Sequence, residues 1–537
     1  MPIVNPLPAF LAASAFNNIS RAMFDDTFSG IHRLAWFDWA ILLPYFGILA
    51  ILSIYGLHRF DTIHTYFKHR KKATGEPALQ FENLPLVTIQ LPLYNERYVL
   101  ERLIDEVVKI EYPRELLQIQ VLDDSTDDTH QFAEALCERY RNIGHPIEYL
   151  HRTNREGFKA GALQEGLKGA TGEFVVVFDA DFIPPTDFLT RTIHHFSDPK
   201  VGVVQTRWSY LNRGFNFLTE VEAILLDGHF ILEHGARSRA GYFFNFNGTA
   251  GILRRSMIDD AGGWQHDTLT EDSDLSYRAQ LKGWKFVYLP GLECPSELPV
   301  EIHGFQVQQF RWAKGLTQCA KKLLPSLFAA KIPFRVKAEA FLHLTPNISY
   351  PLMMVISALM LPVMIVRFYM GVWEMVLLDF PLIVASFWSI SAFYVIAQRE
   401  LHPKNWKRTF LLLPMLMAVG VGLTLINTRA VLEALFGVQS GFVRTPKYAI
   451  EGTVQKRMTV KQYKRRSGWL PYFELACGTY FLYMCWFAIE TFNYPTLPFL
   501  TLFVGGYYWA GFGTLYQEYQ DRLRHNRQHR LEFETAR

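Results

Sequence analysis

Cysteine is scarce in this chain. Five cysteines stand among 537 residues, and no two of them have CxxC spacing. An odd number in a large chain argues against a disulfide framework, and the missing CxxC spacing argues against a zinc site. We expect all five to be reduced residues that pack in the interior: Cys137, Cys294, Cys319, Cys477 and Cys485.

An excess of charge of either sign is also missing. The 54 basic and 51 acidic residues leave a formal charge of +3. Since no basic helix or nucleic-acid motif accompanies this balance, nucleic acid is excluded as an expected partner. The N-terminus has apolar stretches but no basic segment before them. We therefore expect no cleaved signal peptide, and a first membrane segment that is retained.

Apolar residues, by contrast, are abundant. The chain is 50% hydrophobic and 15% aromatic, which is more than soluble globular proteins usually carry. Residues 34–57 form a mostly apolar run, and about 20 such residues suffice to cross a bilayer. The segment 58–72 is basic, and basic flanks favour the cytosolic side. Residues 1–72 are therefore expected to hold an N-terminal segment and the first transmembrane helix.

Residues 80–335 contain no segment that is long and apolar enough to span a membrane. The β-rich runs "LPLVTIQLPLYNE", "LLQIQVLDDS", "HPIEYLHR" and "GEFVVVFDADF" alternate there with helix-like stretches. This alternation indicates βαβ units and a mainly parallel sheet, with ligands bound at the carboxyl ends of the strands. We expect a cytosolic α/β domain.

Apolar segments return in residues 336–516. They lie at 347–366, 373–397, 409–428, 469–491 and 494–516. The segments 398–408 and 444–466 and the tail 517–537 are basic and are expected to be cytosolic. Because two cytosolic segments cannot flank a simple span, 409–428 is interpreted as an interfacial or re-entrant helix. This leaves five transmembrane helices, with six as the alternative.

Acidic clusters follow two of the predicted strands. Asp123 and Asp124 come directly after one apolar run, and Asp179 and Asp181 end another. A solvated loop or a helix cap would explain one such cluster but not a series of them. The two carboxylates of the DxD pair project to the same side of an extended chain. Carboxylate oxygens suit Mg²⁺ or Mn²⁺ held jointly with substrate phosphates, which predicts a nucleotide-diphosphate site.

A third acidic motif precedes an amphipathic helix. In "TLTEDSDLSYRAQLKGW", Thr270 is followed by Glu271 and Asp272. One interpretation is an N-cap, since Thr and Asp satisfy free amides at a helix start. The other is catalytic: in a glycosyl transfer the acceptor hydroxyl must lose its proton, and a positioned carboxylate can accept it. Asp272 is the first candidate for this base and Glu271 the second.

The motif "QVQQFRWAKG" joins polar and aromatic residues on one helix face. Gln308, Arg311 and Trp312 project together because residues three and four positions apart share a face. Arginine can neutralise a leaving diphosphate, and tryptophan can stack on a sugar ring. A basic amphipathic helix on the membrane surface is the alternative, and both interpretations can hold.

The ordered series "LPLYNE", "LDDS", "DAD", "TED" and "QQFRW" resembles the processive inverting family 2 glycosyltransferases, which include the cellulose, chitin and hyaluronan synthases. The stretches "FFNFNGTAGILRR" and "ELPVEIHGFQVQQFRWAKG" resemble more narrowly the cellulose-synthase-like A and C proteins and bacterial cellulose synthase catalytic subunits. The resemblance covers roughly residues 85–455. It implies an α/β GT-A domain fused to an α-helical transmembrane channel.

The resemblance also implies roles for individual residues. It assigns donor binding to seven residues: Tyr94, Asn95, Glu96, Asp123, Asp124, Lys159 and Asp179. The metal, Mg²⁺ or Mn²⁺, falls to Asp179 and Asp181. It assigns catalysis to Asp272, with Glu271 beside it. It assigns binding of the diphosphate and of the acceptor end to Asn247, Gly248, Gln308, Arg311 and Trp312.

The stretch "FVRTPK" at 442–447 resembles the gating loop that closes over the donor in cellulose synthases. It carries Phe442, Thr445 and Lys447 at the matching positions, with Arg444 where the family has valine. An ordinary basic loop beside the membrane is the alternative.

The function implied is a membrane-embedded hexosyltransferase that polymerises a β-glucan or β-mannan from a UDP- or GDP-hexose and moves the growing glycan across the membrane. UDP-glucose is preferred over GDP-mannose, although no residue ties the site to one sugar. Bacterial inner membrane or plasma membrane is the expected location, with lipid around the helices. A transferase that adds one sugar to a lipid acceptor is the alternative. A transporter or scaffold would place ionisable groups inside the spans, where this sequence has few.

Overall fold

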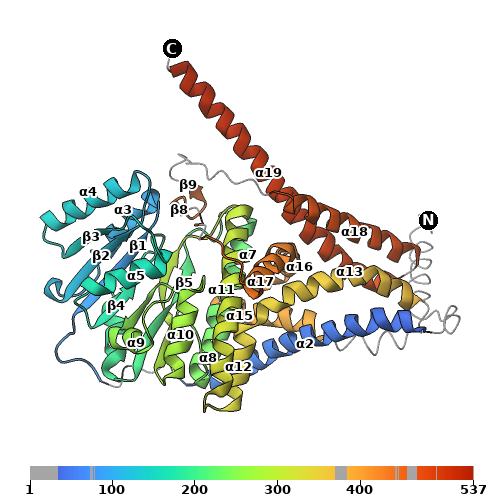
Figure 1. Cartoon of the computed structure of the whole chain (residues 1–537), viewed down its shortest axis with the longest axis horizontal. Helices are drawn as coiled ribbons and strands as arrows, with labels where there is room; N and C mark the ends of the chain where they lie inside the picture. The colour runs from blue at the N-terminus through green and yellow to red at the C-terminus, as the bar shows by residue number, and fades with distance from the viewer. Residues whose placement is uncertain are drawn as a thin grey trace, which may run out of the picture.

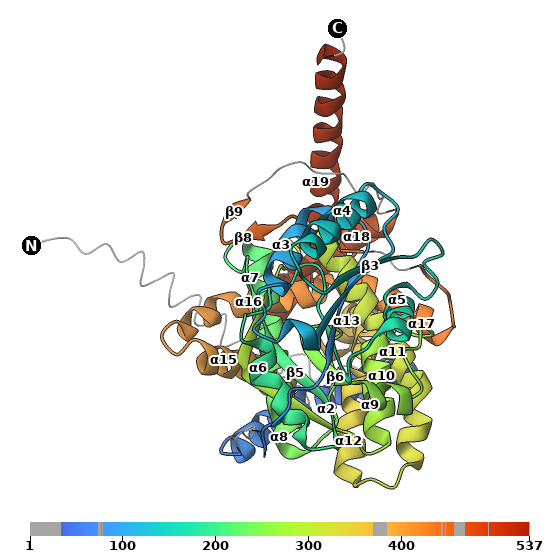
Figure 2. The same cartoon turned by 90° about the vertical axis from the view of Figure 1, so that its left-hand side faces the viewer.

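The computed structural model describes residues 34–72, 77, 79–368, 384–441, 444–445, 447–455, 468–491 and 493–535. An α/β domain forms one side of the molecule and a group of long helices forms the other (Figure 1). The last helix, α19 (Leu497–Thr535), extends beyond the rest of the protein in both views (Figures 1 and 2). This division into an α/β part and a helical part agrees with the sequence-based prediction.

The α/β domain is built on a seven-stranded sheet with the order β3-β2-β1-β4-β6-β5-β7. The strands are β1 Val87–Leu93, β2 Leu117–Asp123, β3 Ile147–His151, β4 Phe174–Val177, β5 Val201–Tyr210, β6 Gly251–Arg254 and β7 Lys285–Ser296. Strands β1 to β4 are parallel to one another, and β7 is parallel to β5. Strand β6 runs antiparallel to both of its neighbours, so the sheet is mixed but mainly parallel.

Helices cover both faces of this sheet. Successive side chains of a strand point to opposite faces, and in β4 Phe174 and Val176 enter one core while Val175 and Val177 enter the other. The first core is closed by α3 (Arg97–Val107), α4 (Thr129–Asn142) and α6 (Phe188–Thr192). The second is closed by α5 (Phe158–Gly169), α9 (Arg255–Asp260) and α10 (Glu271–Leu281). Because the sheet is buried on both faces, its strands are apolar along their whole length.

A layer of helices joins the sheet to the long helices. It consists of α7 (Phe217–Gly228), a π-helical turn (His229–His234), α8 (Gly235–Ala240), α11 (Ile302–Ala329) and α12 (Phe334–Leu344). Leu218 and Val221 of α7 share one core with Phe305 of α11 and with Tyr66 of the first long helix. Helix α11, which follows β7, is thereby anchored to the helical part of the molecule.

Three described helices are long and apolar enough to cross a membrane: Trp36–His69 (α2), Pro346–Arg367 and Leu470–Glu490 (α18). They match three of the expected spans. Residues Trp406–Gly422 and Thr424–Leu435 form a pair bent by 43°, which is either a broken span or a re-entrant loop. This bend lies in the segment for which a re-entrant helix was predicted.

The remaining helices are α13 (Ser349–Phe368), α15 (Ser389–Leu401), α16 (Thr409–Gly422), α17 (Thr424–Leu435) and α19. The expected span at 373–397 lies partly outside the described residues. The number of spans, five or six, therefore stays a prediction.

Candidate active site

The acidic motifs gather where the parallel strands end. Tyr94 follows β1, Asp123 is the last residue of β2, and Asp179 lies just beyond β4. These three strands are hydrogen-bonded neighbours with parallel registers. Their carboxyl ends therefore meet at one edge of the sheet, which is the ligand-binding edge of open α/β sheets.

The loops after β1 and β2 hold each other in place. Asn95, at φ 56°, donates its backbone N–H to Ser125 Oγ at 2.8 Å and accepts the Thr126 N–H at 2.9 Å. Asp123 is fully buried and accepts from Ser125 N and Tyr149 Oη, each at 2.8 Å. With both oxygens bonded, Asp123 fixes the loop that carries the next aspartate.

Asp124 is paired with an arginine that the sequence analysis missed. Arg152 Nε and Nη2 lie 2.8 and 2.6 Å from the two carboxylate oxygens of Asp124. Such a two-pronged pair fixes both side chains. The signal for Arg152 was its place directly after β3, at the same edge of the sheet.

The DxD pair is held by two lysines from distant segments. Lys159 Nζ donates to Asp179 Oδ1 and, at 3.0 Å, to the Gly248 carbonyl. Burial would lower the pKa of Lys159, but Asp179 and Glu271 raise it above its usual value. Lys447 Nζ lies 2.7 Å from Asp181 Oδ2. Each carboxylate of the pair therefore has a lysine ammonium group fixed beside it.

Three described residues of the segment that resembles a gating loop, Arg444, Thr445 and Lys447, lie near the carboxyl ends of β1 and β4. Arg444 Nε is 3.0 Å from Glu96 Oε1, and the same guanidinium donates to the carbonyls of Tyr94 and Asn95. The Thr445 side chain is buried. Phe442 lies outside the described residues. Arg444, the departure from the family pattern, thus contacts the first donor motif directly.

Glu297, which the sequence analysis also missed, anchors the far end of this loop. It accepts Lys447 Nζ on its carbonyl at 2.6 Å and Tyr448 N–H on its carboxylate at 2.8 Å. Burial raises the pKa of Glu96 to about 7, against the opposing effect of Arg444. The segment that holds Arg444 and Lys447 is therefore tied by ion pairs to Glu96 at one end and to Asp181 at the other.

Asp272 lies in the first turn of α10, in the electrostatic field of Lys159, the residue that binds Asp179. It accepts the Ser273 N–H at 2.7 Å. Burial raises the pKa of Asp272 to about 7, and neighbouring Glu271 raises it in the same direction. Thr270 stands at the N-cap but makes no capping hydrogen bond through its side chain, so the capping interpretation does not account for the motif.

Gly248 permits the close approach of Asp272 to the DxD region. Its φ is +80°, and a Cβ there would lie 3.0 Å from Asp272 Oδ2 and 3.6 Å from Lys159 Nζ. The Oδ1 of the preceding Asn247 accepts a hydrogen bond from His234 Nε2 at 2.8 Å. The turn at Gly248 therefore sets the distance between the candidate base and the cation on Asp179.

Helix α11 packs tightly against the start of α10. A Cβ at Gly315 would lie 2.8 Å from the backbone nitrogen of Thr270, so only glycine allows this contact. One turn earlier, burial lowers the pKa of Arg311, against the opposing effects of nearby Glu271, Asp179 and Asp272. The structure thus brings Arg311 to the acidic site, as the motif predicted.

Trp312 and Gln308 face the protein interior. Trp312 packs against Ala223 and Leu226 of α7 and against Leu298, and Gln308 is buried. This part of α11 therefore packs against the protein, while the membrane-surface interpretation of the helix stays a prediction.

The residues present fit a divalent cation that is shared with a substrate. No group of three or more His, Cys, Asp or Glu side chains in the described part of the chain could hold a metal alone. Asp179 and Asp181 offer hard oxygen ligands, and Mg²⁺ is commonly bound by one or two carboxylates with phosphate and water completing its shell. The donor set is therefore suited to a metal-diphosphate complex.

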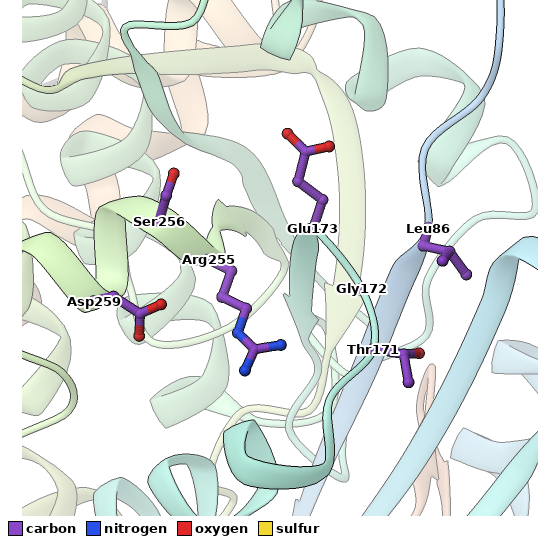
Figure 3. A pocket seen from close by; sticks show the side chains of 7 residues that line it. All are labelled: Leu86, Thr171, Gly172, Glu173, Arg255, Ser256 and Asp259. Atoms are coloured by element: carbon purple, nitrogen blue, oxygen red, sulfur yellow. The ribbon is translucent and has the colours of Figure 1, made fainter.

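An open hollow of about 440 Å³ lies at the opposite edge of the sheet (Figure 3). Its lining includes Glu173 and Arg255. Glu173 is paired with Arg254 at 3.0 Å, and Arg255 donates to the carbonyls of Ala170 and Leu167. These polar groups are already satisfied, and the hollow is separate from the acidic site.

Known proteins resemble this chain in the same region. The family model described as glycosyltransferase like family 2 matches residues 85–315. Glucomannan 4-beta-mannosyltransferase 2 of Arabidopsis thaliana is 42% identical over 279 residues, which are 51% of this chain and 50% of that protein. Glucomannan 4-beta-mannosyltransferase 1 of Oryza sativa subsp. japonica is 43% identical over 263 residues, which are 48% of this chain and 50% of that protein.

The chain therefore spans about half the length of the curated relatives that it matches. A solved structure, the mannosyltransferase PcManGT from Pyrobaculum calidifontis in complex with GDP-Man and Mn²⁺, is 23% identical with a TM-score of 0.48. That likeness covers 67% of this chain and 100% of the other. The predicted resemblance to cellulose-synthase-like glycosyltransferases and the GT-A-like fold are confirmed by the family match and the relatives.

Proposed function

We propose that this chain, which is similar to the cellulose-synthase-like glycosyltransferases, polymerises a β-linked hexose polysaccharide from a nucleotide sugar. The observation that carries the proposal is the position of Asp272. Its carboxyl has a pKa raised to about 7 and lies in the electrostatic field of Lys159, the residue that binds Asp179. A base poised near neutral pH beside a diphosphate site is what glycosyl transfer to a hydroxyl requires.

In the proposed reaction, the donor diphosphate binds at Asp179 and Asp181. A divalent cation held there would neutralise negative charge on the departing diphosphate. Arg311 stabilises the same charge from α11, since it already lies in the field of these carboxylates. The leaving group is thus met by cationic groups from two sides.

Asp272 removes the proton of the acceptor hydroxyl. The hydroxyl oxygen forms a bond with the anomeric carbon of the sugar as the bond from that carbon to the diphosphate breaks. The proton ends on the Asp272 carboxylate, and the electron pair of the broken bond leaves with the nucleoside diphosphate. Attack from the face opposite an α-linked leaving group produces a β-linkage.

The segment Arg444 to Lys447 closes the donor edge. Its contacts with Glu96 and Asp181 place two cations between the donor motifs and solvent. Exclusion of water favours transfer to a sugar over hydrolysis of the donor. Thr445 and Lys447 keep the hydroxyl and the cation of the pattern that this loop resembles.

We infer that the donor is a UDP- or GDP-hexose. UDP-glucose, which was preferred from the sequence, stays a prediction, whereas the names of the matched relatives describe mannosyl transfer and support GDP-mannose. No contact in the site ties it to one base. Both donors therefore belong in the same assay.

We also propose that the glycan passes through the helical part of the protein. Three membrane-length helices and the packing of α11 and α7 against α2 in one core support membrane association beside the site. A cytosolic catalytic domain, export of the product and the gating role of 444–447 are parts of this proposal. Transfer of a single sugar to a lipid acceptor is the second candidate.

A transfer assay tests the proposal. Purified protein in nanodiscs is incubated with Mn²⁺ or Mg²⁺ and separately with radiolabelled UDP-glucose, UDP-N-acetylglucosamine and GDP-mannose. A high-molecular-weight product that linkage-specific glycanases digest supports a polysaccharide synthase and identifies its sugar. Label found only in a small product extractable into organic solvent supports the lipid acceptor instead.

A further inference from the structure

Two histidines hold the side chain of Asn247, the residue before the turn at Gly248. His234 Nε2 lies 2.8 Å from Asn247 Oδ1, and His229 Nε2 lies 3.1 Å from Asn247 Nδ2. The two imidazole rings also contact each other, with centroids 4.3 Å apart. Both polar atoms of the amide are therefore bonded to rings from one short segment, the π-helical turn His229–His234.

The π-helical turn explains why both rings reach the same amide. His229 and His234 are the first and last residues of this turn. In an α-helix, with 3.6 residues per turn, side chains five positions apart point about 140° away from each other. A π-helical turn, whose hydrogen bonds join residues five positions apart, brings such side chains onto nearly the same face, and single turns of this kind are frequent at functional sites.

The direction of the hydrogen bonds fixes the proton on each ring. An amide oxygen only accepts and an amide nitrogen only donates, so His234 donates through its Nε2 while His229 accepts at its Nε2. The Nδ1 of His229 then carries the proton, and it lies 2.9 Å from Glu233 Oε2. Burial would raise the pKa of Glu233, but Arg237 and His229 lower it well below its usual value. The Glu233 anion therefore selects the tautomer of His229 that accepts from Asn247.

The second ring is neutral and has a fixed orientation as well. Burial lowers the pKa of His234 well below its usual value, and its Nε2 also lies 3.1 Å from the Asn245 carbonyl. Its Nδ1 has no hydrogen-bond partner in the described part of the chain, which agrees with a single proton on Nε2. Asn247 can thus bond to both rings in only one orientation of its amide.

The anchored residue leads into a turn that lies between two groups of the active site. The Gly248 carbonyl accepts from Lys159 Nζ at 3.0 Å, and a Cβ at Gly248 would lie 3.0 Å from Asp272 Oδ2. The Asn247 backbone N–H donates to Gln205 Oε1 of β5 at 2.9 Å. A shift of this turn would therefore change the positions of Lys159 and Asp272 relative to each other.

We propose that His229, with His234 beside it, is a positioning residue that acts through Asn247. The two rings fix the amide, the amide fixes the turn at Gly248, and the turn sets the distance between the candidate base and the lysine on Asp179. This inference rests on the proposed function, because it concerns the geometry of that reaction. Neither histidine belongs to a motif that the sequence analysis singled out.

Two replacements of His229 separate its two hydrogen bonds. The amide of glutamine reaches the position of Nε2 and can accept from Asn247, whereas the amide of asparagine reaches only the position of Nδ1 and can donate only to Glu233. The variants are His229→Gln, His229→Asn, Asn247→Ala and the double variant His229→Asn/Asn247→Ala. His64→Asn, at an exposed histidine of α2, is the matched control. All are full-length chains in nanodiscs.

The first measurement is hydrogen–deuterium exchange of backbone amides in peptides that cover residues 245–250, and it requires no activity. We expect exchange there to rise about fivefold or more in His229→Asn, because the turn loses a hydrogen bond that holds it. His229→Gln and His64→Asn should stay within about twofold of the unaltered protein. Peptides from β1 and β2 should exchange equally in all variants.

The second measurement is the kinetics of transfer at varied donor concentration. In His229→Asn we expect kcat to fall by about tenfold to 10²-fold, since misplacement of reacting groups by about 1 Å can cost 10²-fold. KM for the donor should stay within about threefold, and His229→Gln should restore most of kcat. In the Asn247→Ala background, the further change His229→Asn should alter neither exchange nor kcat by more than about twofold, because the histidine acts through this amide.

Equal exchange in His229→Asn and His229→Gln overturns the proposal, and so does a further loss when His229→Asn is added to Asn247→Ala. A His229→Asn chain that does not fold overturns it as well, because the ring would then support the fold and not the turn. In a chain that transfers sugar, an exchange response with unchanged kcat also overturns it. If exchange responds as expected while the unaltered chain makes no product from any donor, the proposed function fails and the anchoring of the turn stands.

Discussion

Lys447 Nζ lies 2.7 Å from Asp181 Oδ2, although the two residues are 266 positions apart in the chain. The pair joins the segment before α18 to the segment after β4. Both side chains are largely buried, and removal of one partner from a buried ion pair typically costs about 3–5 kcal/mol. The position of this loop is therefore coupled to the charge at the DxD motif.

Replacement of Lys447 should weaken donor binding. In Lys447→Met the Asp181 carboxylate loses its cation and the loop loses its bond to the Glu297 carbonyl. We expect the donor affinity, measured calorimetrically with Mn²⁺ present, to fall by about tenfold or more. Lys404→Met, at an exposed position, is the control and should bind normally. Unchanged affinity in Lys447→Met would remove the loop from the donor site.

The Asp272→Asn variant separates binding from chemistry. Asparagine preserves the shape of the side chain but cannot accept the proton of the acceptor hydroxyl. Donor affinity should stay within about twofold, while transfer falls by about 10²-fold or more. Asp267→Asn, on the exposed loop before α10, should retain activity. Transfer near the normal rate in Asp272→Asn would assign the base to another group.

Transfer should depend on pH with an acid limb near neutrality. Because burial raises the pKa of Asp272 to about 7, the carboxyl is protonated below that value and cannot act as a base. The rate at saturating donor should fall about tenfold per pH unit below about 7. The same raised pKa means that Asp272 lowers the stability of the fold as pH rises from its ordinary pKa of 3.8 to about 7. A flat pH–rate profile from 5 to 8 contradicts this assignment.

Removal of the DxD carboxylates should abolish metal-dependent binding. In Asp179→Asn/Asp181→Asn the two hard anionic ligands are lost, and so is the charge that holds Lys159 and Lys447. Binding of the donor should no longer respond to Mn²⁺ or to its removal by EDTA, whereas the unaltered protein should lose affinity on chelation. Retention of a metal-dependent signal in the double variant would refute the metal role.

The contact between α11 and α10 should tolerate no side chain at Gly315. A Cβ there lies 2.5 Å from Thr270 Cγ2, so Gly315→Ala forces the helices apart at a cost of about 1–3 kcal/mol. Both the thermal midpoint and the transfer rate should fall, since Arg311 moves with the helix. Gly291→Ala, where the added atom meets nothing within 4 Å, is the control. Equal midpoints for the two variants would show that the contact is not tight.

The strands and the place of the acidic motifs were predictable because both depend on local pattern. Apolar runs such as 87–93 and 117–123 form the predicted strands, and parallel strands bring their carboxyl ends together regardless of the rest of the fold. The motifs at Asp123, Asp179 and Asp272 could therefore be assigned to one site from their order in the chain.

Other parts of the site depend on contacts that no local pattern encodes. The sequence analysis did not single out Arg152 or Glu297, and their roles appear only when the loop after β2 and the segment at 447–450 reach them. Arg444 was noticed as a departure from a pattern, but its guanidinium reaches Glu96 only because the chain returns to the sheet after α17.

The amino-acid pattern was thus sufficient for the fold class, the ordered motifs and the type of chemistry, since periodicity and side-chain chemistry are local properties. Folding in three dimensions decided which charged groups are paired with each other and how far Asp272 is buried. Those properties depend on the distances between residues that are remote in the chain, and only the packing of the complete protein sets such distances.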